Sequence, residues 1–517
     1  MATNRSCVPI RYPTPRDYEI ATDAMDSMRP IGAVADQLQL PGDSAHLLSF
    51  GDRFAKVDHR CLDKSGVDRK GRIIHVTAMT PTPKGSGKTL TAIALTDGLN
   101  RVLTSRGGGQ RATFVLRQPS QGPTLGMKGG ACGGGYSQVL PMEDINLQFT
   151  GDFAAVTQVH NLIWATLMSF INRKGNAAGV DLDSITWPRV VDLCDRSIRS
   201  FQVAADGRNG AGLPQFEGHS VITAASEIMA SLGISSGLDD LSRRIDRIVL
   251  GAYDDGSPLT IRDLEIGAGA VSLLRLAIHP NLVQTLDGSP AFIHTGPFAN
   301  IAHGNSSRVG LNLARRAADF FVTEGGFAAD LGAQKFHDIV LRTNGGRAHA
   351  EVVAASLRDL KHQGGATPRG ENRTERNRYL YDPDPEALVR GVDNIAVHIE
   401  NLRAYDLPVV VALNRFGSDF AGEIDLAIRT IEERTGPPLR PIPAMLKGAR
   451  APWNWLKPSW LLSMLLTTPE SPVDCTRTLH RSLSVSKRLR PRSTDQAPWP
   501  GQIEPERSSN PSTGWRN

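Results

Sequence analysis

Residues 72–99 read RIIHVTAMTPTPKGSGKTLTAIALTDGL and contain the pattern that decides the fold. The run from Arg72 to Met79 is apolar and β-branched, as expected of a buried strand. A loop of prolines and glycines follows, and the stretch from Thr89 to Leu99 is typical of a helix. The order of strand, glycine loop and helix predicts a unit of an α/β protein.

Four further apolar runs are strand candidates. Arg111 to Leu116 (RATFVL) and Pro408 to Leu413 (PVVVAL) are the stronger pair, and Ile339 to Leu341 and Ala350 to Ala355 are weaker. Strands of this kind, buried on both faces and alternating with helical stretches, are typical of a parallel sheet covered by helices. The predicted fold class is therefore α/β, with a mostly parallel sheet of the P-loop type flanked by helices.

Two parts of the chain differ from this pattern. Residues of about 153–280 are expected to form a mainly helical inserted region, with helices at Val191 to Phe201 and Thr223 to Leu232. Residues 441–517 form a basic tail rich in Pro, Ser, Arg and Trp that lacks periodicity, so we expect it to be poorly structured. Residues 1–440 are the predicted body of the protein.

Composition limits the classes of protein that this chain can belong to. Of its 517 residues 40% are hydrophobic and 21% charged, enough to bury a large core and to exclude general disorder. There is no run of about 18 apolar residues and no apolar N-terminal segment, which predicts a chain without a membrane partner or a secretory signal. Five scattered cysteines without a CxxC pair favour a reducing, cytoplasmic location.

The positive charge is confined to the tail. Residues 441–517 hold 11 Lys and Arg against 5 Asp and Glu, which leaves 47 basic and 48 acidic residues in 1–440. A folded nucleic-acid-binding domain needs a basic face in the body of the chain as well. The distribution therefore argues against a nucleic-acid partner.

The glycine loop predicts phosphate binding. Its glycines let backbone N–H groups turn inward toward phosphate oxygens, at the positive end of the following helix. Lys88 can reach the outer phosphates and the Thr89 hydroxyl can bind Mg²⁺. A glycine turn with a surface lysine is the ordinary alternative, and the loop is a variant because Thr82 replaces the usual glycine. The predicted ATP-binding residues are Thr82, Pro83, Lys84, Gly85, Ser86, Gly87, Lys88 and Thr89.

Several long motifs together resemble the formate–tetrahydrofolate ligase family, over about residues 28–435. One of them contains a second glycine cluster, which would let a ligand approach the backbone closely. The matching stretches are TPTPKGSGKT at 80–89, GMKGGACGGGYSQVLPMEDINLQFTGD at 126–152, PNLVQTLDGSPAFIHTGPFANIAHG at 280–304, TEGGFAADLGAQKF at 323–336 and PVVVALNRF at 408–416.

The resemblance implies an enzyme of one-carbon metabolism, with formate, ATP and tetrahydrofolate as small-molecule substrates. It implies ATP-dependent ligation of formate to tetrahydrofolate through formyl phosphate, giving 10-formyltetrahydrofolate, ADP and phosphate. It further implies ATP with Mg²⁺ as cofactor, a cytoplasmic homotetramer, and the monovalent cation that the family often uses.

The resemblance also assigns roles to individual residues. Lys88 and Arg117 suit the transferring phosphate and the formyl phosphate, and Asp152 would orient the folate amine or manage its proton. Phe298 resembles an aromatic residue near the folate site. On their own, Arg117 would be a surface ion-pair partner, Asp152 a turn or helix cap, and Phe298 a core residue.

The chain departs from the family pattern in the loop, beside Arg117 and at its end. Lys84 and Ser86 replace Ala and Glu of the family loop, and Gln118 replaces a Glu. Agreement ends soon after Thr435, which fits either a shifted reading frame or a lineage-specific tail that binds a partner. The alternative function is a catalytically impaired relative that retains nucleotide binding because its C-terminal lobe is lost.

Overall fold

The computed structural model describes residues 15–442 except 44, 64–68, 84, 122–126, 129–131, 173–175, 177, 192–195, 204–215, 345, 367–377 and 437–438. All but the first two residues of the predicted tail, 441–517, lie outside this range. Those two belong to the last strand of the main sheet, β20 (Leu439–Ile442). The sheet therefore continues to Ile442, slightly past the body predicted at 1–440.

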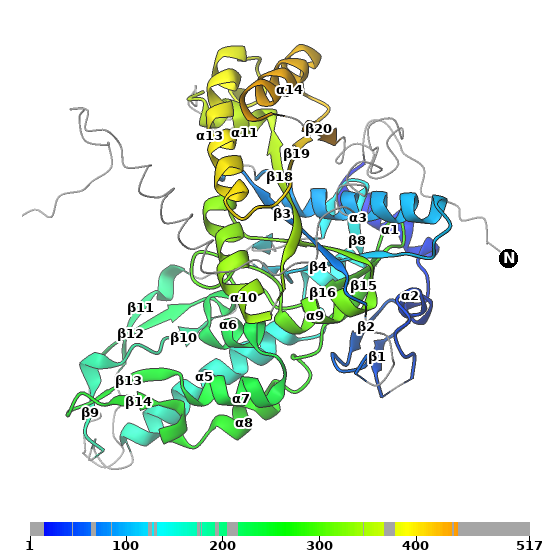
Figure 1. Cartoon of the computed structure of the whole chain (residues 1–517). Helices are drawn as coiled ribbons and strands as arrows, with labels where there is room; N and C mark the ends of the chain where they lie inside the picture. The colour runs from blue at the N-terminus through cyan, green and yellow to red at the C-terminus, as the bar shows by residue number, and fades with distance from the viewer. Residues whose placement is uncertain are drawn as a thin grey trace, which may run out of the picture. The chain divides into compact units, whose positions relative to one another are not determined.

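A large, mostly parallel sheet forms the centre of the described chain (Figure 1). Its strands are parallel from β16 to β20, whereas β1, β2, β15 and β16 pair antiparallel. This confirms the predicted fold class. In spatial order the strands are β1 (Leu47–Phe50), β2 (Phe54–Val57), β15 (Asn281–Thr285), β16 (Pro290–Ile293), β4 (Ala112–Leu116), β17 (Phe320–Glu324), β3 (Arg72–Ala78), β18 (Ala348–Ser356), β19 (Val409–Asn414) and β20.

Helices cover both faces of this sheet, which explains why its central strands are apolar throughout. Ile74 of β3 packs in the same core cluster as Leu95 of α3 (Lys88–Ser105). The neighbouring Ile73 points to the other face and packs with Leu311 of α9 (Arg308–Ala317). Successive side chains of a strand point to opposite faces, so a strand covered on both sides has no polar alternation.

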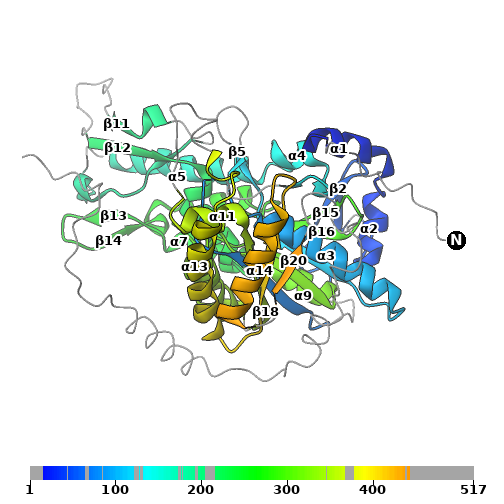
Figure 2. The ribbon, with the colours of Figure 1, turned by 90° about the horizontal axis from the view of Figure 1, so that it is seen from above.

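Three further helices lie against β18 and β19: α11 (Leu357–Gln363), α13 (Pro385–Arg403) and α14 (Ala421–Thr435). Figure 2 shows α13 and α14 side by side next to β18. Val353 and Val411 of the sheet share a buried cluster with Ile395 of α13. The start of α13 follows from its sequence, because the Asp384 carboxylate accepts a hydrogen bond from the Ala387 amide and Pro385 occupies the first turn.

Residues 152–280 combine helices with two small sheets. The helices α5 (Asp152–Asn172), α6 (Glu227–Ile234), α7 (Leu238–Asp246) and α8 (Gly267–Leu273) share one buried core. One three-stranded sheet contains β10 (Arg189–Val190), β12 (Phe216–Val221) and β11 (Ser200–Val203). The other contains β14 (Pro258–Thr260), β13 (Val249–Tyr253) and β9 (Val180–Asp181). The predicted helix at 223–232 is confirmed as a short 3₁₀ turn followed by α6.

The helix α5 is long and apolar enough, by length and composition alone, to cross a membrane. Its buried residues include Val156, Ile163 and Leu167, which pack in the core just described. Core helices of soluble proteins can have the same length and composition, so this one helix is weak support for a membrane span.

Two local predictions are wrong. Val191 to Phe201 is not one helix: the described part contains a 3₁₀ turn (Arg196–Ile198) and the start of β11, where Phe201 pairs with Gly218. Ile339 to Leu341 is not a strand but the end of a π-helix, Phe336–Leu341. Its buried residues Phe336, Val340 and Leu341 follow helical spacing, and three apolar letters are too few to show this.

The remaining helices and strands are short. They are α1 (Asp17–Ala24), α2 (Ile31–Gln37), α4 (Met142–Asn146), α10 (Arg342–Asn344), β5 (Ser120–Gln121), β6 (Met127–Lys128), β7 (Gly133–Gly134) and β8 (Ser137–Leu140). A second π-helical segment, Ala329–Ala333, precedes the one at 336–341.

Candidate active site at the carboxyl edge of the sheet

Three adjacent parallel strands bring the predicted phosphate-binding residues together. β4, β17 and β3 are neighbours in that order, and their carboxyl ends lie at the same edge of the sheet. The glycine loop follows β3, Arg117 follows β4 directly, and Glu324 is the last residue of β17. Ligands of open α/β sheets bind at this edge, beyond the carboxyl ends of the strands.

The glycine loop has the backbone conformation that its sequence requires. Gly85 and Gly87 have φ angles of 70° and 75°, which side chains other than glycine adopt at a cost. Gly87 is the N-cap of α3, so Lys88 and Thr89 form its first turn. Of the eight predicted loop residues, Lys84 lies outside the described part of the chain.

Two side chains from elsewhere in the sequence, which were not predicted to contact the loop, hold it in place. The Asn414 amide, at the end of β19, donates a 2.8 Å hydrogen bond to the Ser86 carbonyl. A Cβ atom at Gly87 would lie only 2.7 Å from the same amide nitrogen, so this position has no room for a side chain. At the start of the loop the Thr82 hydroxyl donates to the Asp359 carboxylate over 2.6 Å.

Glu324 connects the three strand ends. It is 2% exposed and accepts a 2.8 Å hydrogen bond from the Thr89 hydroxyl. Its other carboxylate oxygen lies 3.9 Å from the Arg117 guanidinium. Burial lowers the pKa of Lys88 below its ordinary value, while the Glu324 carboxylate opposes this change. The sequence placed Glu324 in a family motif but gave no sign of its role.

Arg117 is buried and keeps part of its hydrogen-bonding capacity free. One guanidinium nitrogen donates to the Pro297 carbonyl over 3.3 Å, while Nε has no partner among the described residues. Burial lowers the Arg117 pKa, and the Glu324 carboxylate opposes this effect. A guanidinium fork held in this way suits a planar or tetrahedral anion. The alternative of an exposed ion-pair residue is excluded by its 7% exposure.

Asp152 belongs to a second polar cluster. It is the first residue of α5, and its carboxylate forms a 2.7 Å ion pair with the ammonium of Lys56. The Asn281 amide donates a further 3.0 Å hydrogen bond to it. Lys56 and Asp152 are both almost fully buried. Among the described residues, neither Lys88 nor Arg117 forms a hydrogen bond with Asp152, so the two clusters are separate. Lys56 carried no recognisable signal in the sequence.

A short loop connects the two clusters. Gln118 follows Arg117 directly in the chain. Its backbone N–H donates a 2.6 Å hydrogen bond to the backbone carbonyl of Thr295. A Cβ atom at the next residue, Gly296, would lie 2.5 Å from the Gln118 carbonyl and 2.6 Å from the ring of Phe153. Gly296 therefore lets the start of α5, with Asp152, pack closely against the segment that carries Arg117.

Phe298 and His303 lie further along the same loop. Phe298 is half-buried beside the core of α5 to α8, and its amide donates to the Ala224 carbonyl over 3.1 Å. His303 is buried, and burial lowers its pKa to about 4, so it is neutral at pH 7. The packing of Phe298 is compatible with either a core role or contact with a ligand on its exposed side.

The first cluster can bind an anion and a hard cation together. Lys88, Arg117 and the N-terminus of α3 supply positive charge. The Thr89 hydroxyl and the Glu324 carboxylate supply the oxygen atoms that Mg²⁺ prefers. This combination fits a phosphorylated substrate that carries Mg²⁺.

The fold and this site define an α/β enzyme with a glycine-rich loop at the carboxyl edge of a parallel sheet. The sequence profile of the family described as formate–tetrahydrofolate ligase matches residues 15–451, a longer stretch than the residues 28–435 over which the motifs resemble it. The chain belongs to this family.

Individual relatives of the chain have the same family name. The chain is 46% identical to formate–tetrahydrofolate ligase of Pseudothermotoga lettingae over 417 residues, which cover 81% of this chain and 71% of the relative. It is 47% identical to the ligase of Fervidobacterium nodosum over 413 residues, 80% of this chain and 71% of the relative. The ligase of Petrotoga mobilis is 45% identical over 410 residues, 79% and 70% of the two chains.

Proposed function

We propose that the protein ligates formate to tetrahydrofolate at the expense of ATP and forms 10-formyltetrahydrofolate, ADP and phosphate. The observation that carries the proposal is the convergence of Lys88, Thr89, Arg117 and Glu324 at three neighbouring strand ends, in a chain of this family. Membership alone would not require these four groups to be present and close together.

In the first step a formate oxygen attacks the γ-phosphorus of ATP, and the bond to the ADP oxygen breaks. Phosphoryl transfer of this kind needs positioning and neutralisation of charge. We assign Lys88 to the transferring phosphoryl group and Thr89 to the Mg²⁺ that accompanies ATP. Thr82 to Thr89 would enclose the phosphates, and Arg117 would hold the resulting formyl phosphate through its free fork.

In the second step N10 of tetrahydrofolate attacks the formyl carbon and phosphate leaves with the bonding electrons. The folate amine must lose a proton, and we assign its orientation or its proton to Asp152. The Lys56 ammonium lies 2.7 Å from this carboxylate and holds it in place. Phe298 would offer an aromatic surface to the folate.

Three further properties belong to this proposal because family resemblance supports them. They are a homotetrameric assembly, a monovalent cation as activator and a cytoplasmic location without nucleic-acid or membrane partners. Light scattering of the purified chain tests the first, and replacement of K⁺ by a bulky organic cation in the assay tests the second.

The alternative is an impaired relative that still binds nucleotide. It is favoured by the loss of family resemblance near the end of the chain and by the replacements Ser86 and Gln118 close to the site. It predicts ATP binding that depends on Lys88, without formation of product.

The decisive experiment incubates the full chain with ATP, Mg²⁺, formate and tetrahydrofolate, and follows product after its acid conversion to the methenyl form. We expect product that requires all three substrates and that falls about 100-fold or more in Lys88→Ala. Lys70→Ala, at an exposed lysine before β3, is the matched control and should retain full activity. ATP binding without product would favour the impaired relative, and absence of both would refute the proposal.

A further inference from the structure

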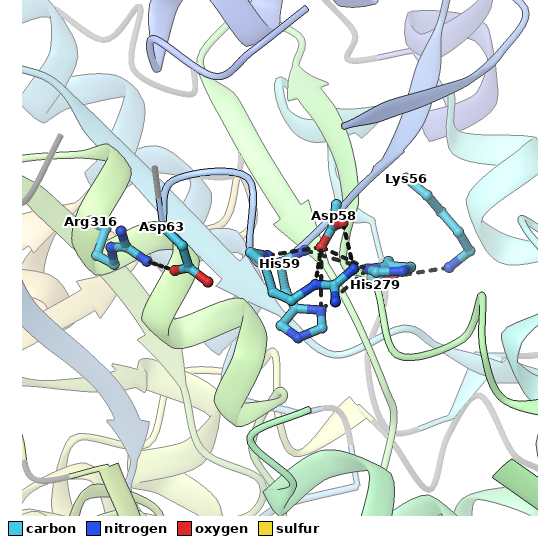
Figure 3. A network of polar contacts seen from close by, with 7 residues as sticks. Lys56, Asp58, His59, Asp63, His279 and Arg316 are labelled. Carbon is cyan, nitrogen blue, oxygen red and sulfur yellow. Dashed lines mark hydrogen bonds and ion pairs between the residues drawn. The ribbon is translucent and has the colours of Figure 1, made fainter. Parts of the chain in front are cut away.

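Three potential metal ligands meet at one end of β2, outside the site described above. Asp58 and His59 follow β2, and His279 lies two residues before β15, the antiparallel neighbour of β2. One donor atom from each residue lies within 4.8 Å of the other two. Figure 3 shows the Asp58 carboxylate beside the two imidazole rings. We call this group the Asp58–His59–His279 cluster.

The distances in the cluster resemble those around a tetrahedral metal ion. The Nδ1 atoms of His59 and His279 are 3.2 Å apart. Asp58 Oδ1 lies 3.9 Å from the first and 3.8 Å from the second. Zinc bonds of about 2.0–2.1 Å place neighbouring tetrahedral ligands roughly 3.3–3.4 Å apart. The two nitrogens are therefore already at the required separation, and the carboxylate needs to move by only about 0.5 Å.

We propose that the Asp58–His59–His279 cluster binds one divalent transition-metal ion of the zinc type. Two imidazoles and one carboxylate are a donor set that suits Zn²⁺ better than Mg²⁺ or Ca²⁺, which prefer oxygen alone. Their side chains are 9–17% exposed, so a water molecule can fill the fourth position. On binding, the hydrogen atom between the two Nδ1 atoms moves to an Nε2 atom, so both imidazoles bind as neutral ligands without net loss of a proton.

Neighbouring groups hold the ligands in place, as is usual around metal sites. The Arg60 amide and Nε donate hydrogen bonds of 2.9 and 3.1 Å to Asp58 Oδ1, and a third Arg60 nitrogen donates to Oδ2. The Lys56 ammonium donates to the His279 carbonyl over 3.1 Å. The Lys56 ammonium is paired with Asp152, whereas Arg60 is paired with Asp58 itself and would share this carboxylate with the ion.

A bound ion would join the end of β2 to the segment that leads into β15. The same segment is connected through Lys56 to Asp152, the proposed folate-side carboxylate. The ion would therefore stabilise the folded chain and fix the position of Lys56, without itself contacting a substrate.

Titration of the metal-free full chain with Co²⁺ tests the proposal, because tetrahedral Co²⁺ absorbs strongly in the visible range. We expect one Co²⁺ per chain, its displacement by Zn²⁺, and a higher melting temperature with Zn²⁺. His59→Asn and His279→Asn should each weaken binding by at least about tenfold. His46→Asn is the matched control, because His46 also lies beside an aspartate, Asp43, but on the surface.

Binding that is weakened in the two variants and kept in the control would support the site. Absence of visible bands in the wild-type chain would overturn it, as would binding that both variants retain. Since Co²⁺ absorbance and melting are read without substrates, the outcome is independent of whether the chain proves to be an active ligase.

Discussion

At the scale of single residues, the environment of Arg117 says most about the ligand that the site can bind. Its guanidinium is buried, positioned by the Pro297 carbonyl and close to Glu324. A buried positive charge is costly unless it is compensated, and Glu324 compensates it only from 3.9 Å. An anion bound to the free part of the fork would complete this balance.

We therefore expect Arg117→Lys to lower kcat about 100-fold while the KM for ATP changes little. Lysine keeps the charge but cannot offer two parallel N–H donors to one anion. Steady-state kinetics with each substrate varied in turn measures the effect. Arg390→Lys, at an arginine 58% exposed on α13, controls for a general effect of the exchange. Wild-type kcat in Arg117→Lys would contradict the assigned role.

At the scale of elements, α5 runs from Asp152 into the region of the two small sheets. Its His160 is buried against Trp187, with the rings 4.0 Å apart. The imidazole donates to the Pro188 carbonyl over 2.8 Å, and its Nδ1 lies 2.8 Å from the Ser226 hydroxyl. Three segments are thus fixed by one neutral ring.

This arrangement predicts loss of stability in acid. Burial lowers the folded-state pKa of His160 to about 4, against 6.5 when unfolded. Below pH 6.5 His160 becomes protonated in the unfolded chain but stays neutral in the folded chain. The free energy of unfolding therefore falls as the pH falls. The loss from His160 alone reaches about 3 kcal/mol near pH 4.

Urea unfolding at pH 7, 6, 5 and 4 measures this loss. His160→Gln should be less stable at pH 7 yet lose less stability between pH 7 and 4 than the wild type. His219→Gln, at an exposed position of β12, should keep the wild-type pH dependence. An unchanged pH dependence in His160→Gln would show that this ring does not cause the acid sensitivity.

At the scale of the whole molecule, we propose that the body that folds independently ends near residue 442. The last strand pairing of the main sheet joins β19 to β20, which ends at Ile442. A chain that stops after Ile442 should melt cooperatively, within a few degrees of the full chain. A chain that stops after Gly346 loses β18 to β20 and should show no cooperative transition, because β3 becomes an uncovered edge strand. Calorimetry and limited proteolysis distinguish these outcomes.

The sequence predicted the buried strands and the glycine loop better than it predicted the individual residues of the site. The strands β3, β4, β18 and β19 were found because burial on both faces leaves uninterrupted apolar runs. The glycine loop was found because its backbone conformation restricts the residues allowed. Lys56 and Glu324 were missed as site residues, because each is placed by a partner far away in the sequence, at separations of 96 and 235 positions.

The order of strands in the sheet also affects how this chain is made. β3 ends at Ala78, yet the two strands that flank it, β17 and β18, begin at Phe320 and Ala348. At a synthesis rate of about 5–20 residues per second, β3 and the glycine loop leave the ribosome roughly 10–50 s before their neighbours exist. We expect the apolar side chains of Ile73, Ile74 and Val76 to stay exposed during this interval, which would make the nascent chain prone to aggregation or to binding by chaperones.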